Sequence, residues 1–237
     1  MITKQEFIIR RSDERGGANH GWLNAKHSFS FANYFDPKHM GFRSLRVINQ
    51  DIIAGGGGFP THPHENMEIF SYILSGALAH KDSMGNSRTL TPGMIQLMSA
   101  GSGVTHSEFN PSATEPAHLL QIWIHPSKQS LTPSYTEWQP NEEQSKQAKA
   151  LIISEDGRDQ SATIHQDVSI YKLQLKANEN ISHELADGRG MWLQMIKGSL
   201  TIDEHTIHAG DAISTEHAGN INIKSLESTE AILFDLK

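Results

Sequence analysis

Tyr72-Ile73-Leu74-Ser75-Gly76-Ala77-Leu78 is a short apolar run that a glycine interrupts, and Pro92-Gly93 and Ala100-Gly101 follow it. β-Branched and aromatic residues favour extended chain, while Gly and Pro-Gly favour turns. The segment therefore predicts short antiparallel strands that are connected by tight turns.

The second half of the chain repeats this order. Met195-Ile196-Lys197-Gly198-Ser199-Leu200 is followed by Ala209-Gly210-Asp211 and then by Ala218-Gly219. A strand, a glycine turn, a strand and a second glycine turn thus occur twice. This internal repeat suggests two duplicated antiparallel barrels.

The rest of the chain fits an all-β protein. Its apolar segments are short and helical periodicity is scarce. Between Pro126 and Ala148 the composition changes to Pro, Ser, Gln, Lys and Glu, which is typical of a linker with a helical turn or two near its end. We expect two antiparallel β-barrel, jelly-roll-like domains, at residues 1–130 and 149–237, with a linker at 131–148.

Composition excludes several functional classes. The chain has 27 acidic and 20 basic residues, a net charge of −7 and no basic cluster, so we expect no nucleic-acid partner. It has no cysteine, which leaves only nitrogen and oxygen groups as metal donors. The first residues do not form a signal peptide, and no apolar run reaches the ~18 residues of a membrane span. We expect a cytoplasmic protein without a membrane partner.

Histidines and acids occur in pairs with a spacing of two. His62-Pro63-His64 is followed by Glu68, and alternation in an extended segment would place all three polar side chains on one face. His106-Ser107-Glu108 has the same spacing. A lone histidine is more often structural, but two matched pairs favour one ion held by three imidazoles and one carboxylate. Glu68 and Glu108 are both candidates for that carboxylate.

Such a site would leave one or two coordination positions open, which implies catalysis or ligand sensing rather than a structural role. Its donors suit Fe(II), Mn, Co, Ni, Cu or Zn. Several phenylalanines in the same half could line a pocket for a flat aromatic substrate, although core packing explains most of them; we assign about one in three to a pocket. They are Phe29, Phe31, Phe35, Phe42, Phe59 and Phe70.

A longer series of motifs runs through the first half: Asn19-His20-Gly21-Trp22-Leu23, Phe29-Ser30-Phe31-Ala32, Asp36-Pro37, His39-Met40-Gly41-Phe42, Leu45-Arg46-Val47-Ile48-Asn49, His62-Pro63-His64, Asp82-Ser83-Met84-Gly85-Asn86, and Met98-Ser99-Ala100-Gly101-Ser102-Gly103 before His106-Ser107-Glu108. Together they resemble the pirin family of the cupin superfamily. Looser matches continue to Leu233-Phe234-Asp235-Leu236, so the resemblance covers nearly the whole chain. Within that family, the sequence most resembles the bacterial members that cleave quercetin.

The resemblance implies a bicupin whose N-terminal domain holds a metal through His62, His64, His106 and Glu108. It favours Glu108 over Glu68, although the usual cupin carboxylate matches Glu68, whose role stays open. In the second half, His183-Glu184-Leu185 lacks the second imidazole, and we expect no metal there. Glu65 stands where relatives commonly carry a basic residue, which argues against a preference for anionic ligands.

The implied function is that of a metal-dependent dioxygenase, a quercetin 2,3-dioxygenase that opens the central ring of flavonols and releases carbon monoxide. Glu108 would act as the general base, and flavonol and dioxygen would be the partners of a monomeric enzyme. Among the possible ions we expect Fe(II). The alternative is a metal-dependent, redox-sensing regulator that binds a protein partner, as animal pirins are thought to do.

Overall fold

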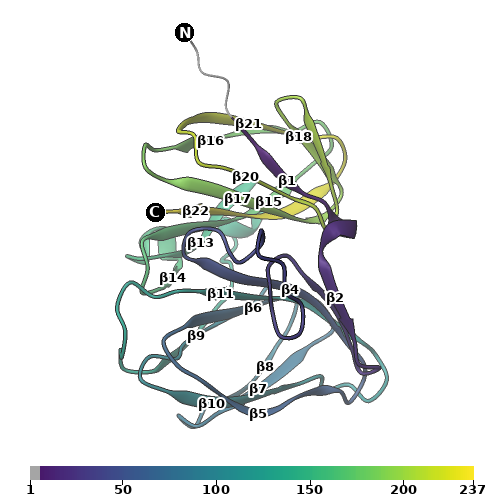
Figure 1. Cartoon of the computed structure of the whole chain (residues 1–237), viewed down its shortest axis with the longest axis vertical. Helices are drawn as coiled ribbons and strands as arrows, with labels where there is room; N and C mark the ends of the chain where they lie inside the picture. Colours follow the sequence, from purple (N-terminus) through teal and green to yellow (C-terminus); the bar gives the residue numbers. More distant parts are fainter. Residues whose placement is uncertain (1–5) are drawn as a thin grey trace. The chain divides into compact units, whose positions relative to one another are not determined.

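The structure is a computed structural model that describes residues 6–237, and the chain forms two compact units (Figure 1). The N-terminal unit comprises Arg15–Pro140 and Ile164–Gln166. The C-terminal unit comprises Asn141–Thr163 and Asp167–Lys237, together with the described residues up to Glu14. Each unit contains one seven-stranded and one four-stranded sheet. The predicted all-β, bicupin fold class is confirmed, although each unit is an open, jelly-roll-like pair of sheets rather than a closed barrel.

In the N-terminal unit, the large sheet has the order β12-β9-β6-β11-β4-β3-β2 and the small sheet the order β5-β10-β7-β8. The strands are β2 (Gly16–Asn19), β3 (Leu23–His27), β4 (Leu45–Ile53), β5 (Gly58–His64), β6 (Glu68–Ser75), β7 (Leu78–Asp82), β8 (Ser87–Leu90), β9 (Ile95–Ser99), β10 (Val104–Phe109), β11 (Ala117–Ile124) and β12 (Ser134–Trp138).

In the C-terminal unit, the large sheet has the order β1-β20-β17-β22-β15-β13-β14 and the small sheet the order β16-β21-β18-β19. The strands are β1 (Ile8–Arg10), β13 (Lys149–Ser154), β14 (Ala162–Thr163), β15 (Val168–Leu175), β16 (Asn180–Leu185), β17 (Gly190–Lys197), β18 (Ser199–Ile202), β19 (His205–His208), β20 (Ala212–Thr215), β21 (Gly219–Ser225) and β22 (Thr229–Leu236). Three 3-10 turns complete the described elements: η1 (Ser12–Glu14), η2 (Gln144–Lys146) and η3 (Arg158–Gln160). No helix within residues 6–237 has the length and apolar character that a membrane span needs.

Burial explains the strands. In β3 buried and exposed residues alternate, as expected for a strand with one face on the core, whereas β6 in the middle of its sheet is buried over most of its length. Among the described strands, every pairing is antiparallel except that of β13 with β14. The short, turn-rich segments of the sequence therefore become antiparallel strands, as predicted.

The internal repeat has a structural counterpart in two glycine turns. Gly76 follows β6 with a φ of +74°, and Gly198 follows β17 with a φ of +79°. A Cβ on Gly76 would lie 2.6 Å from the carbonyl oxygen of Pro116, and one on Gly198 would collide with the carbonyl oxygen of Ser228. Glycine is needed at both turns because backbone packs directly against it.

Two segments differ from the boundaries that composition suggests. β1 pairs with β20, so the beginning of the described chain adds a strand to the C-terminal unit instead of belonging to a domain at 1–130. Within the expected linker at 131–148, β12 pairs with β9 and extends the large sheet of the N-terminal unit. Both are edge strands, and their place depends on distant partners that local composition does not indicate.

Candidate metal centre

The three histidines of the predicted site lie on two neighbouring strands. His62 and His64 are on β5 and His106 is on β10, where His106 pairs directly with His62. Because side chains alternate along a strand, His62 and His64 share one face. Antiparallel pairing of the two strands then brings His106 next to His62 and His64.

The three imidazoles converge. The ring centroids of His62 and His106 are 4.4 Å apart, and each lies 4.8 Å from the centroid of His64. One ring nitrogen from each residue lies within 4.8 Å of the others. The three residues thus form a group that could hold a single metal ion.

Hydrogen bonding leaves nitrogens available for an ion. His62 uses Nδ1 to donate to the carbonyl oxygen of Pro60 at 2.8 Å. His106 Nδ1 lies 3.4 Å from His80 Nδ1, while its buried Nε2 has no partner among the described residues. A buried polar atom without a partner is unusual, and a metal ligand explains it.

Electrostatics favour the neutral form that a metal requires. Burial, followed by the neighbouring His62, lowers the pKa of His64 to about 4. Burial and the surrounding imidazoles His62, His64 and His80 lower the pKa of His106 to about 2. Near neutral pH both rings therefore carry free lone pairs and need not lose a proton to bind an ion.

Glu108 lies next to this cluster and is only 1% exposed. One of its oxygens, together with a nitrogen of His80 and one of His106, forms a second close group, which does not include His62 or His64. Gln121 Nε2 donates to Glu108 Oε2 at 2.7 Å, and Ser71 Oγ lies 3.2 Å from Oε1. Burial outweighs these hydrogen bonds and raises the pKa of Glu108 to about 7.

Glu68 lies elsewhere. Residues 65–67 separate β5 from β6, so the alternation that would align Glu68 with the histidines is broken. Glu68 accepts a hydrogen bond from Ser99 Oγ at 2.7 Å and lies 3.4 Å from His165 Nδ1. It belongs to neither group of close ligand atoms. The structure thus gives Glu68 a role in packing β6 against β9.

His80 is a functional candidate that sequence reasoning missed. On β7 its Nε2 faces Asp82 at 3.2 Å, and its Nδ1 accepts a hydrogen bond from Gln96 Nε2 at 2.9 Å. The spacing of His80 and Asp82 is the same two residues as in the other pairs and could have marked them. His80 Nδ1 also lies 3.4 Å from His106 Nδ1, so His80 contacts one of the three site histidines.

A polar row crosses the large sheet beneath this site. Ser71 on β6 pairs with Gln96 on β9 and with Gln121 on β11, which in turn pairs with Asn49 on β4. This row lies between two separate apolar clusters of the N-terminal unit. In the C-terminal unit, the row through Leu193 contains Ile213, Leu233 and Tyr171, which belong to or pack against a single apolar cluster.

A cavity of about 340 Å³ opens beside the polar row. His62, His64 and Glu108 line it, together with the aromatic rings of Phe31, Phe59 and Trp123 and the polar residues His27, Asn49, Asp51 and Gln121. Of the six phenylalanines singled out in the sequence, Phe31 and Phe59 thus line the cavity. A space that combines aromatic walls with placed polar groups is typical of a small-molecule site.

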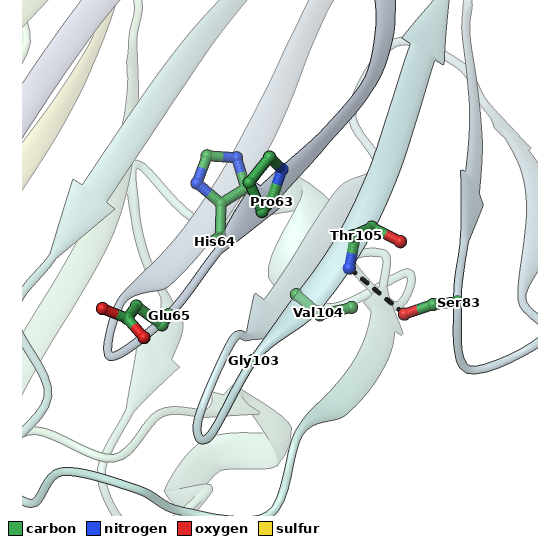
Figure 2. Close-up of a pocket in the computed structure, with 7 residues that line it drawn as sticks. All are labelled: Pro63, His64, Glu65, Ser83, Gly103, Val104 and Thr105. Carbon is green, nitrogen blue, oxygen red and sulfur yellow. Dashed lines mark hydrogen bonds between the residues drawn. The ribbon is translucent and has the colours of Figure 1, made fainter.

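A second hollow of about 580 Å³ lies at the surface beside His64 (Figure 2). Glu65 and residues 103–105 also line it, and Thr105 donates its backbone N–H to Ser83 Oγ at 3.1 Å. His64 lines both spaces. Glu65 thus lines the same surface hollow as one of the three site histidines.

The equivalent position in the C-terminal unit has other chemistry. His183 on β16 pairs with Ile221 on β21, where β10 carries His106. His183 Nε2 lies 3.1 Å from Asp235 Oδ2, and Lys149 Nζ donates to His183 Nδ1 at 2.9 Å. Both ring nitrogens of His183 are therefore engaged within the unit.

Comparisons with known proteins agree with this geometry. The family model described as Pirin matches residues 9–124, and the one described as quercetinase C-terminal cupin domain matches residues 151–236. The chain is 46% identical over 230 residues to the quercetin 2,3-dioxygenase of Escherichia coli strain K12, across 97% of this chain and 98% of that protein. It is 37% identical over 237 residues to a pirin-like protein of Caulobacter vibrioides, across 99% of each.

A solved structure extends the comparison to three dimensions. The bacterial pirin YhhW from Escherichia coli, in complex with nickel(II), matches with a TM-score of 0.93 and 44% identity over 98% of this chain and 99% of that chain. The likeness includes both units. The chain therefore belongs to the pirin family.

Proposed function

We propose that this protein is a metal-dependent quercetin 2,3-dioxygenase, which opens the central ring of flavonols and releases carbon monoxide. The observation that carries the proposal is the convergence of three imidazoles beside Glu108 at a cavity with aromatic walls. A relative that is 46% identical over nearly the whole chain bears the name of this activity.

The cavity suits a flat, partly polar molecule. Phe59 packs edge-on against Trp22 at 5.1 Å between ring centroids, and Phe31 packs edge-on against Trp123 at 5.3 Å. Such rigid aromatic contacts hold a wall in place and keep water away from a bound ring. The polar row supplies the few groups that would orient the hydroxyls of the substrate.

A divalent transition ion, when bound, would supply the positive charge that lowers the pKa of the substrate hydroxyl. His62, His64 and His106 would hold it, and we propose Glu108 as the additional ligand and as the base. With a pKa of about 7, Glu108 suits proton acceptance near neutral pH.

The oxygen of Glu108 that would take this proton is Oε1. Ser71 has a single hydroxyl hydrogen, and its shorter contact is with Gln121 Oε1 at 2.7 Å rather than with Glu108 Oε1 at 3.2 Å. Oε1 thus has a longer contact with Ser71 than Oε2 has with Gln121 at 2.7 Å, which makes Oε1 the oxygen better placed to take a proton.

Further proposals concern the ion and the state of the protein. We propose Fe(II) as the ion, and the nickel(II) complex of YhhW makes Ni(II) its first rival. We also propose that the N-terminal unit binds the metal and the C-terminal unit does not, and that the protein is a cytoplasmic monomer. Dioxygen and the flavonol are the expected partners.

Activity of metal-loaded protein with quercetin tests the proposal, with loss of quercetin, uptake of dioxygen and release of carbon monoxide followed together. Turnover with matched dioxygen uptake and carbon monoxide release, absent in the metal-free protein, supports it. Metal-loaded protein that leaves quercetin intact overturns it and moves the assignment to the redox-sensing regulator, which a pull-down dependent on metal oxidation state would detect.

A further inference from the structure

Asp51 is a buried acid that the metal centre does not use. It lies on β4, lines the cavity and is only 3% exposed. Its Oδ1 has no hydrogen-bond partner among the described residues. The two amide side chains of the cavity do have hydrogen-bond partners: Asn49 bonds to His27, and Gln121 bonds to Ser71 and Glu108.

The neighbours of Asp51 explain why its carboxyl has no partner. In the sheet it pairs with Ala25 on β3 and with Leu119 on β11, neither of which has a polar side chain. The charge that acts on it is that of Glu108, which has the same sign. A buried carboxyl with apolar neighbours and a like charge has no structural benefit, so a ligand is the natural partner.

The position of Asp51 relative to Glu108 suits a second contact with one ligand. Asn49, two residues earlier on the same face of β4, is level with Gln121, which holds Glu108. Two residues of strand span about 6.6 Å. Asp51 thus lies one step along the cavity from the row that holds Glu108, toward Leu23 and Phe59.

We propose that Asp51 is a specificity-determining residue that accepts a hydrogen bond from a phenolic hydroxyl on an outer ring of the substrate. The inference rests on the proposed function and narrows its substrate class to polyhydroxylated flavonols. A site built to hold a hydroxyl discriminates strongly against an analogue without it, because the protein group is then left unpaired.

Two flavonols test the proposal. Quercetin carries further hydroxyls on its outer rings, whereas 3-hydroxyflavone carries only the hydroxyl on the ring to be opened. The dissociation constants of both are measured by calorimetry without dioxygen, and kcat/KM with dioxygen, at pH 8 with metal-loaded wild type, Asp51→Ala and Asp51→Asn. Asp187→Ala, an exposed acid of the C-terminal unit, is the control.

Asp51→Ala is expected to weaken quercetin binding and kcat/KM about tenfold or more while 3-hydroxyflavone changes less than about twofold. Asp51→Asn, whose amide oxygen still accepts a hydrogen bond, is expected to lie between Asp51→Ala and wild type. Equal effects on both flavonols, or no effect, overturn the role of Asp51 but leave the dioxygenase intact. If wild type neither binds nor cleaves either flavonol, the proposed function itself fails, and this inference with it.

Discussion

Ser71 and Leu193 occupy the same position in the two units, each five residues before the glycine that follows its strand. Ser71 contacts Gln121 and Glu108, whereas Leu193 belongs to a continuous apolar core. The two units thus share a fold but not an interior. The polar interior of the N-terminal unit is where the candidate chemistry lies.

Replacing a histidine of the cluster tests the ligand set. His62→Ala and His106→Ala are each expected to lose metal retention and turnover, because two imidazoles no longer hold the ion firmly. The fold should persist, which circular dichroism checks while elemental analysis measures the metal. His208→Ala, an exposed histidine on β19, is the matched control. Full metal content in either cluster variant would mean that the ligands are assigned wrongly.

Glu108→Gln separates the role of base from that of ligand. A glutamine keeps the size of the side chain but does not accept the substrate proton, so turnover is expected to fall about a hundredfold or more. Metal content should fall much less, since the three imidazoles remain. Equal losses of metal and activity would reduce Glu108 to a ligand.

Glu68→Gln distinguishes the two acids that the sequence left open. Glu68 bonds Ser99 and lies outside both groups of close ligand atoms. We expect unchanged metal content and kcat within about twofold, with a loss of stability of about 1 kcal/mol from the weakened hydrogen bond. Metal analysis and thermal unfolding of this variant beside Glu108→Gln check it. Loss of the metal from Glu68→Gln would mean that Glu68 is a metal ligand and that the carboxylate was assigned wrongly to Glu108.

The pKa of Asp51 predicts how stability depends on pH. Burial, and then the charge of Glu108, raise the pKa of Asp51 to about 7 from an ordinary value of 3.8. Between these values the unfolded state releases the proton and the folded state keeps it, so this group costs stability as pH rises through that window. Asp51→Asn removes the cost.

The melting temperature of metal-free Asp51→Asn, relative to that of wild type, should therefore be higher at pH 8 than at pH 5, by about 2 °C or more. Differential scanning calorimetry of both proteins at both pH values measures this shift. A difference that stays constant between pH 5 and pH 8 would show that Asp51 ionises normally in the folded protein.

Much of the fold was predictable from local sequence. The runs around Gly76 and Gly198 encode strands and turns through residue preferences that act over a few positions. The two-residue spacing was also informative, because His62 and His64 lie on one strand and His106 lies with Glu108 on its neighbour. These features follow from local residue preferences and from the alternation of side chains along one strand.

Other features depend on register and were not visible in the sequence. The row from Asn49 to Gln96 forms only when four distant strands align. Sequence spacing could not decide between Glu68 and Glu108, because the alternation of side chains along β5 does not continue through residues 65–67 into β6. The spacing of His80 and Asp82 is visible in the sequence, but the pairing of β7 with β10 that brings His80 to His106 is not.

Reconstitution of the metal-free protein with one ion at a time tests whether it is a metal-dependent quercetin 2,3-dioxygenase. Separate samples loaded with Fe(II), Mn(II), Co(II), Ni(II), Cu(II) or Zn(II) are given quercetin, and carbon monoxide is measured against dioxygen consumed. We expect metal-dependent turnover with equal amounts of the two gases, with Fe(II) the most active ion. Fully loaded protein that releases no carbon monoxide with any of these ions would contradict it.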